Sequence, residues 1–62
     1  MKVFIGYPNE NKLYENIDRV NLKQDFYGMR YISMVQDLHN TNGKPLVIIA
    51  YIEGALEVKV ED

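Results

Sequence analysis

The sequence contains no cysteine and only one histidine, which excludes several kinds of structural support. Without cysteine there is no disulfide and no thiolate metal site. A single histidine cannot build a multi-histidine metal site. The longest apolar run is also far shorter than the roughly 20 residues that a membrane-spanning helix needs. We therefore expect no metal, no other cofactor and no membrane span.

The length of 62 residues predicts a single small domain covering residues 1–62. A domain of this size buries only about 60% of the surface that its unfolded chain exposes, so extra support is expected. Disulfides and metals are excluded, which leaves oligomerisation or an unusually well packed core. The sequence therefore predicts a homo-oligomer. The start of the chain does not resemble a secretory signal, and we expect a cytoplasmic protein.

A hydrophobic fraction of 47% and a charged fraction of 26% are typical of a folded globular domain. Residues 46–52 form an unbroken apolar run between the turn-forming residues 42–45 and Glu53-Gly54. The run is typical of a strand that is apolar on both faces. So small a chain has little material to cover both faces.

Residues 56–61 alternate strictly between apolar and charged side chains, as a half-buried strand does. Gly54-Ala55 predicts a two-residue type II′ hairpin turn between this strand and the apolar run. Such a hairpin would place Tyr51 opposite Val58. It would also put two sets of side chains on opposite faces of the run. The set expected to face the core is Val47, Ile49 and Tyr51, and the set left without cover is Leu46, Ile48, Ala50 and Ile52.

The secondary structure of the first half of the chain is harder to predict from the sequence. Residues 2–7 have the β-branched and aromatic content of a strand. Residues 16–23 are expected to form a second strand, hairpinned to the first, with a short helix at residues 11–18 as the alternative. Among the five tyrosines, Tyr14 and Tyr27 lie in the more polar segments and are expected to be the exposed ones.

Asp25 is placed to cap a helix, because its side chain could accept a backbone N–H bond. Apolar residues then follow at helical spacing, and the segment ends in a stop signal at residues 40–43. The residues at this spacing are Tyr27, Tyr31, Met34, Val35 and Leu38. Gly28 opposes the helix because it costs about 1 kcal/mol relative to alanine. Residues 29–37 could form a central strand instead.

Together these patterns predict an α+β fold of the ββαββ type, with a largely antiparallel sheet and one helix on one face. The alternative is an all-β meander. In the first arrangement an aliphatic stripe has no cover, and a contiguous exposed apolar patch commonly marks an interaction site. The predicted interface consists of Phe4, Leu46, Ile48, Ala50 and Ile52. The competing interpretation is that residues 8–24 fold over this face and complete an ordinary core.

No catalytic pattern is present. His39 follows Asp37 near the end of the expected helix, where a helix C-terminus alone accounts for it. Ser33 is the only serine and cannot be tied to His39 as a nucleophile. The carboxylates are scattered without the spacing of a metal loop or a paired acid site. We therefore expect a non-enzymatic protein.

A basic and aromatic segment gives the alternative function, nucleic-acid binding. Its candidate contacts are Lys12, Arg19, Lys23 and Arg30, interleaved with tyrosines. Acidic residues intervene, and the net charge is −2, whereas backbone binding needs clustered positive charge. The sequence therefore favours a small self-associating protein-interaction module. Its many residues with A/T-rich codons suggest a regulator from a low-GC genome or a mobile element.

Overall fold

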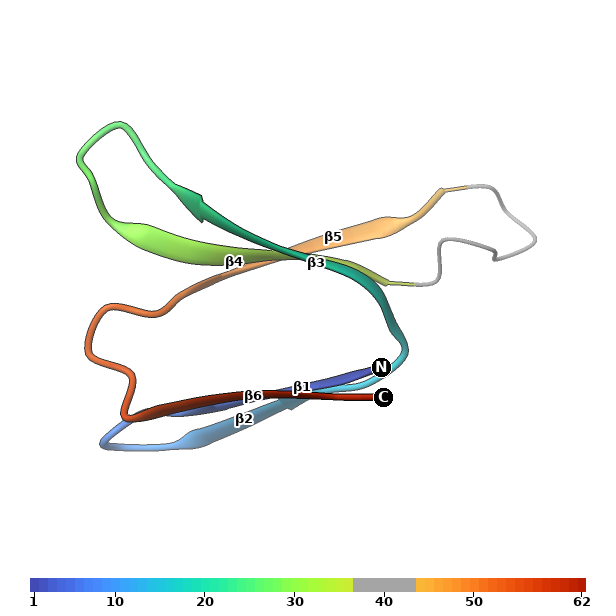
Figure 1. The fold of residues 1–62 in the computed structure, drawn as a ribbon, viewed down its shortest axis with the longest axis horizontal. Helices are drawn as coiled ribbons and strands as arrows, with labels where there is room; N and C mark the ends of the chain where they lie inside the picture. The colour runs from blue at the N-terminus through green and yellow to red at the C-terminus, as the bar shows by residue number, and fades with distance from the viewer. Residues whose placement is uncertain (37–43) are drawn as a thin grey trace.

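Every element of secondary structure in the part of the chain that the structure describes is a β-strand. The computed structural model describes residues 1–36 and 44–62. The strands are β1 (Lys2–Gly6), β2 (Asn11–Tyr14), β3 (Ile17–Gln24), β4 (Arg30–Gln36), β5 (Leu46–Tyr51) and β6 (Glu57–Glu61). They form two antiparallel sheets that face each other, sheet A in the order β2-β1-β6 and sheet B in the order β3-β4-β5 (Figure 1).

This architecture corrects the predicted α+β fold, because the described residues contain no helix. The all-β alternative agrees with the structure, including its central strand, since β4 lies between β3 and β5. No helix in the described residues could span a membrane.

The segment expected to be helical is a strand because both of its edges are paired. Ile32 and Met34 point into the core, while Ser33 and Val35 lie on the opposite face and are half-buried. The spacing of the apolar residues fits a helix and a strand equally well. Pairing with two neighbouring strands favours the strand. The last part of the expected helix, with its stop signal and His39, lies outside the described residues.

Asp25 does accept backbone N–H groups, but in a hairpin loop rather than at a helix start. The amides of Tyr27 and Met29 both donate to its Oδ1 at 2.9 Å. The Gly28 amide donates to the Asp25 carbonyl, and Gly28 has φ 85°. A type I turn followed by a left-handed glycine is a common three-residue hairpin loop. Gly28, which opposed the predicted helix, is the residue that this loop requires.

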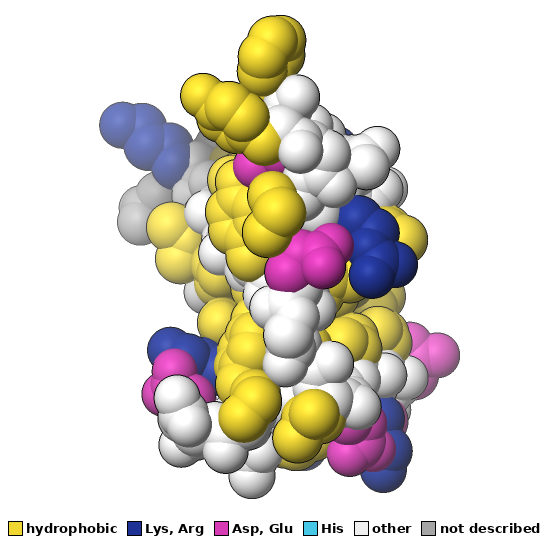
Figure 2. Space-filling model, turned by 90° about the vertical axis from the view of Figure 1, so that its left-hand side faces the viewer, with side chains coloured by type: hydrophobic (Ala, Val, Ile, Leu, Met, Phe, Trp, Pro, Cys, Tyr) yellow, Lys and Arg dark blue, Asp and Glu magenta, His cyan; other side chains and the backbone are white. Residues whose placement is uncertain are grey.

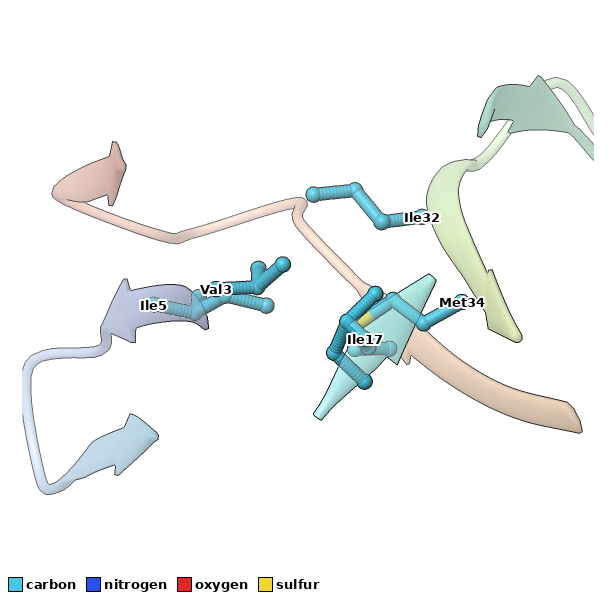
Figure 3. Close-up of a cluster of buried hydrophobic side chains, with 6 residues drawn as sticks. Val3, Ile5, Ile17, Ile32 and Met34 are labelled. Carbon is cyan, nitrogen blue, oxygen red and sulfur yellow. The ribbon is translucent and has the colours of Figure 1, made fainter. Parts of the chain in front are cut away.

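The core lies between the two sheets. Figure 3 shows Val3 and Ile5 of sheet A pointing toward Ile17, Ile32 and Met34 of sheet B. Ala50 is the remaining buried hydrophobic residue, and no polar side chain in the described residues is buried. So few buried side chains give a small core, which agrees with the limited stability expected of a chain this short.

The chain passes from sheet A to sheet B through a bend after β2. Asn16 adopts φ 59°, and Ile17 then exchanges two backbone bonds with Met1, of 2.9 and 2.7 Å. The predicted strand at residues 16–23 is therefore present as β3, but its predicted partner is wrong. β1 is hairpinned to β2, and β3 pairs with β4. The alternative helix at residues 11–18 is replaced by β2 and the start of β3.

A second bend, at Gly54, replaces the predicted hairpin. The Ala55 amide donates to the Ile52 carbonyl at 3.0 Å, and Gly54 has φ 83° at the third position of this turn. Those are the features of a type II turn, which splays the flanking strands instead of pairing them. The predicted pairing of the last two strands is therefore wrong: β5 pairs with β4, and β6 pairs with β1.

Because the pairing differs, the two faces of β5 are reversed relative to the prediction. Ala50 is 6% exposed, and Ile48 and Ile52 pack against the core. Ile49 and Tyr51, which were expected in the core, are 57% and 46% exposed. The face that lacked a cover is covered by sheet A, and the face expected to carry a helix is open.

Candidate interaction surface

The hairpin between β3 and β4 carries two aromatic side chains in solvent. Phe26 is 96% exposed and Tyr27 is 86% exposed. Their rings meet edge to face with centroids 5.6 Å apart. The backbone beneath them is fixed by the bonds to Asp25 and by the positive φ of Gly28. The hairpin therefore presents its aromatic side chains from an ordered loop.

A second aromatic pair continues from the hairpin onto sheet B. Tyr31 of β4 lies opposite Tyr51 of β5, and their ring centroids are 5.4 Å apart. The Tyr51 hydroxyl donates to Oδ2 of Asp25 at 2.9 Å, which ties the end of β5 to the hairpin loop. Figure 2 shows hydrophobic side chains gathered at this end of the molecule, at the top and in the middle of the view. We define the hairpin surface as Phe26, Tyr27, Met29, Tyr31 and Tyr51.

The Asp25 carboxylate is held ionised by the donors around it. Its pKa is lowered from 3.8, first by the bond from the Met29 amide and also by the Tyr51 hydroxyl and the Tyr27 amide. The same contact raises the pKa of Tyr51, because the phenol proton is shared with a negative neighbour. Both groups therefore keep their bonding state at neutral pH.

Tyr7 connects sheet A to the end of β5. Its hydroxyl donates to the carbonyl of Tyr51, and burial raises the pKa of Tyr7. Beside this contact an open groove of about 410 Å³ runs between the two sheets. Its walls include Tyr14 of β2 and Ile49 of β5. The free edge of β5 therefore opens onto a partly aromatic groove.

The structure separates the residues of the predicted interface. Ala50 lies in the core and is only 6% exposed, and Ile48 and Ile52 are partly buried against the core. Leu46 is 56% exposed on the same face. Phe4 lies on the outside of sheet A, where it lines a shallow hollow of about 340 Å³ with Leu13 and charged side chains. These residues do not form one continuous patch.

The candidate nucleic-acid contacts are also divided between the two sheets. Lys12 lies on β2 with its Nζ 3.7 Å from Glu10, and Arg30 pairs with Glu53 at 3.2 Å. The other two cations lie on β3: Arg19 is opposite Val35, and Lys23 is opposite Tyr31. Within the described residues neither of these two has an ion pair. Arg19 and Lys23 therefore share the outer face of sheet B with Tyr31, whereas Lys12 lies with Tyr14 at the groove between the two sheets.

Phe26 is the surface residue that the sequence interpretation missed, because it lay inside the predicted helix. Tyr27 is exposed as predicted, whereas Tyr14 is half-buried against the core. A loop composition was visible at residues 25–28, since an Asp and a Gly there flank two aromatics between alternating segments. That composition would have placed Phe26 at a hairpin tip.

The described residues contain no cluster of acidic or histidine side chains that could hold a metal ion. Comparison with protein-family models, with curated proteins and with solved structures finds no match to this chain.

Proposed function

We propose that this chain is a small non-enzymatic interaction module that binds a protein partner through the hairpin surface. The observation that carries the proposal is the near-complete exposure of Phe26 and Tyr27 on an ordered loop. Within the described residues Phe26 and Tyr27 contact each other but bury little surface against the rest of the protein. Contiguous exposed apolar surface of this kind marks interaction sites on small proteins.

The geometry also suits binding energetically. Aromatic side chains dominate the energy of protein interfaces, and they lose little conformational entropy when they are bound. The loop beneath Phe26 and Tyr27 is fixed before binding by the Asp25 bonds, so less ordering has to occur on association. Tyr31 and Tyr51 extend the contact area onto sheet B.

The proposed module needs no cofactor and performs no chemistry of its own. We place it in the cytoplasm, as a regulator encoded by a low-GC genome or a mobile element. Fractionation of cells that express the tagged chain tests the compartment, and recovery in a membrane or secreted fraction would contradict it.

Capture from a nuclease-treated lysate tests the binding surface. The double variant Phe26→Ser/Tyr27→Ser should lose at least about tenfold in captured partner, because interface anchors are worth roughly 2 kcal/mol or more each. Leu56→Ser is the matched control, since Leu56 is 77% exposed but lies in another loop. Both variants should keep the wild-type melting temperature within a few degrees. Equal capture by the wild type and the double variant would exclude the hairpin surface.

Nucleic-acid binding remains the second candidate, supported by the placement of Arg19 and Lys23 on the same face as Tyr31. Exposed aromatics beside cations can stack bases and contact the phosphate backbone. With two cations, the logarithm of the affinity should fall with the logarithm of salt concentration with a slope of about −2 or shallower. Capture that disappears after nuclease treatment, together with weakened binding in Arg19→Ala/Lys23→Ala, would favour this candidate.

A further inference from the structure

The backbone of β5 is paired on one side only. The Ile52 amide donates to the Arg30 carbonyl at 3.1 Å, which shows that the even-numbered residues of β5 direct their backbone groups toward β4. Backbone groups alternate between the two sides of an antiparallel strand, so those of Val47, Ile49 and Tyr51 point away from β4. The bond from the Tyr7 hydroxyl to the Tyr51 carbonyl agrees with this arrangement. The described contacts provide no partner for the edge groups of Val47 and Ile49.

Within the strand itself, β5 carries none of the sequence features that normally protect an edge. Charged side chains, prolines or bulges within an edge strand discourage pairing with another chain. β5 contains no charged residue, no proline and no register shift. Its side chains are also apolar on both faces. An edge of this kind is a template for an added strand.

We propose that β5 pairs antiparallel with β5 of a second copy of this chain, with Ile48 opposite Ile48. The two three-stranded B sheets then become one continuous sheet around a twofold axis. This proposal rests on the proposed function, which is binding to a protein, because it names a second copy of the chain as one such protein partner. It uses the strand edge rather than the hairpin surface, so the two can fail separately.

The register is selected by hydrogen bonding at the ends of the strand. With Ile48 opposite Ile48, Tyr51 faces Pro45 of the second copy, which has no N–H to donate. The Tyr51 carbonyl, which already accepts the Tyr7 hydroxyl, therefore needs no further donor. The Tyr51 amide can donate to the Pro45 carbonyl. No amide of the second copy therefore competes with the Tyr7 hydroxyl for the Tyr51 carbonyl.

The two neighbouring in-phase registers are both poorer. With Val47 opposite Val47, the Ile49 carbonyl would face Pro45 of the second copy, which has no N–H to donate. If Ile49 were opposite Ile49, the amide of Val47 would face the Tyr51 carbonyl of the second copy. That amide would compete with Tyr7 for the same oxygen. In the proposed register Val47 faces Ile49 instead, and both edge amides meet free carbonyls.

Side-chain burial supports the same partner. In the proposed register Leu46, 56% exposed in the single chain, lies beside Ala50 of the second copy on the inner face. On the outer face Val47 and Ile49, each 57% exposed, meet across the seam. No charged residue of β5 lies at the seam, so no repulsion arises from the twofold symmetry. The sequence is complementary to itself.

The expected affinity is low, because pairing one short strand buries roughly a few hundred Å² per copy, below the about 800 Å² of a standard interface. We expect a dissociation constant on the order of 100 µM. Sedimentation equilibrium from about 10 µM to 1 mM should show a monomer–dimer transition in this range. A wild-type chain that remains a monomer at about 1 mM would overturn the proposal.

Variants of Ile49 test the edge. Ile49→Pro removes only an amide that points away from β4, so the monomer should keep its β-sheet circular dichroism while dimer affinity falls at least tenfold. Ile49→Lys provides a second test that does not depend on tolerance of proline. Val60→Lys, on the edge strand β6, is the matched control and should dimerise as the wild type does. Unchanged dimerisation of Ile49→Lys would overturn the proposal.

Cysteine substitutions test the register, and the chain has no native cysteine to interfere. Under mild oxidation Ile48→Cys should form a disulfide-linked dimer faster than Ile49→Cys, because position 48 faces itself across the axis. Faster cross-linking of Ile49→Cys would overturn the proposed register.

The hairpin variant separates this proposal from the proposed function. Phe26→Ser/Tyr27→Ser should dimerise normally while losing partner capture, and Ile49→Lys should show the reverse. If the hairpin variant abolished dimerisation and Ile49→Lys did not, self-association would use the hairpin surface. That result would overturn the edge-pairing proposal while supporting the proposed function.

Discussion

β5 and β6 are both edge strands, one in each sheet, yet their side chains differ sharply. β5 has no charged residue among its six, whereas β6 has Glu57, Lys59 and Glu61 among its five. The charges of β6 lie on the outside of sheet A, where Lys59 and Glu57 form an ion pair at 3.4 Å. Charged residues on an edge discourage strand addition. β6 is therefore protected against pairing, and β5 is open to it.

The inner faces of the two strands differ in burial, and the inner face of β5 is the more buried of the two. Ala50 of β5 is 6% exposed, while Val58 and Val60 of β6 are 40% and 51% exposed although they lie beside Ile5 and Val3. β5 thus contributes a buried residue to the core and leaves its outer face apolar. β6 contributes half-buried valines and has a charged outer face. An edge position alone therefore does not determine which face of a strand is exposed or whether that face is charged.

The largest expected effect comes from a charge placed on the inner face of β5. Ala50→Asp should lower the free energy of unfolding by at least about 3 kcal/mol, because Ala50 is 6% exposed and the carboxylate would lose most of its hydration. Val60→Asp, on the inner face of β6, should cost about 1 kcal/mol, since the new side chain reaches water. Urea denaturation at low protein concentration measures both values without a contribution from association. A similar loss of unfolding free energy in the two variants would contradict the difference in burial between the inner faces of β5 and β6.

A smaller effect is expected when β6 is made to resemble β5. The double variant Lys59→Val/Glu61→Val removes most of the charge from the free edge and should introduce concentration-dependent association. The measurement is best made in the Ile49→Lys background, where the edge of β5 is blocked and any new association reports on β6. Light scattering should then show an increase in mean mass at high concentration. If this protein stayed monomeric, the charges would not be what protects β6.

The smallest expected effect concerns the contact that ties β5 to the hairpin. The folded state lowers the pKa of Asp25 below 3.8, so its carboxylate adds stability in full above that value. This stability is lost as the pH falls through the lower folded pKa. Asp25→Asn keeps an oxygen acceptor but does not titrate, so its melting temperature should vary less than that of the wild type between about pH 5 and pH 2.

The magnitude of that pH effect is limited, because Asp25 lies near solvent and its interactions are screened. Backbone amide shifts of Met29 should follow the same titration in the wild type. Identical acid dependence in the two proteins would show that Asp25 does not hold the hairpin.

Several local features could be predicted from the sequence, because they depend on neighbouring residues. The β-branched and aromatic content of residues 2–7 identified β1, the alternation in residues 56–61 identified β6, and the apolar run identified β5. The positive φ of Gly54 was also anticipated and is confirmed. These predictions succeeded because strand propensity and glycine conformation are local properties.

The candidate surface was predicted less well, because it depends on which strands pair. The sequence predicts Gly54 at the second position of a hairpin turn, whereas the structure has it at the third position of a bend between the two sheets. This difference reverses the faces of β5. Phe26 was hidden by a helical spacing that also fits a strand. The loop composition of residues 25–28 was a local signal for the position of Phe26, whereas the pairing of β5 cannot be resolved from residues close in the sequence.

The sequence by itself determined that the chain is short, lacks cysteine and contains an uncharged strand at residues 46–51, with positive φ available at Gly54. These are properties of composition and of local backbone preference. Only the tertiary structure decided that β5 pairs with β4, that Ala50 faces the core, and that Phe26 and Tyr27 stand in solvent. Strand pairing joins residues far apart in the chain, and a strand's alternation is equally compatible with either face. The partner strands therefore determine which face of β5 is buried.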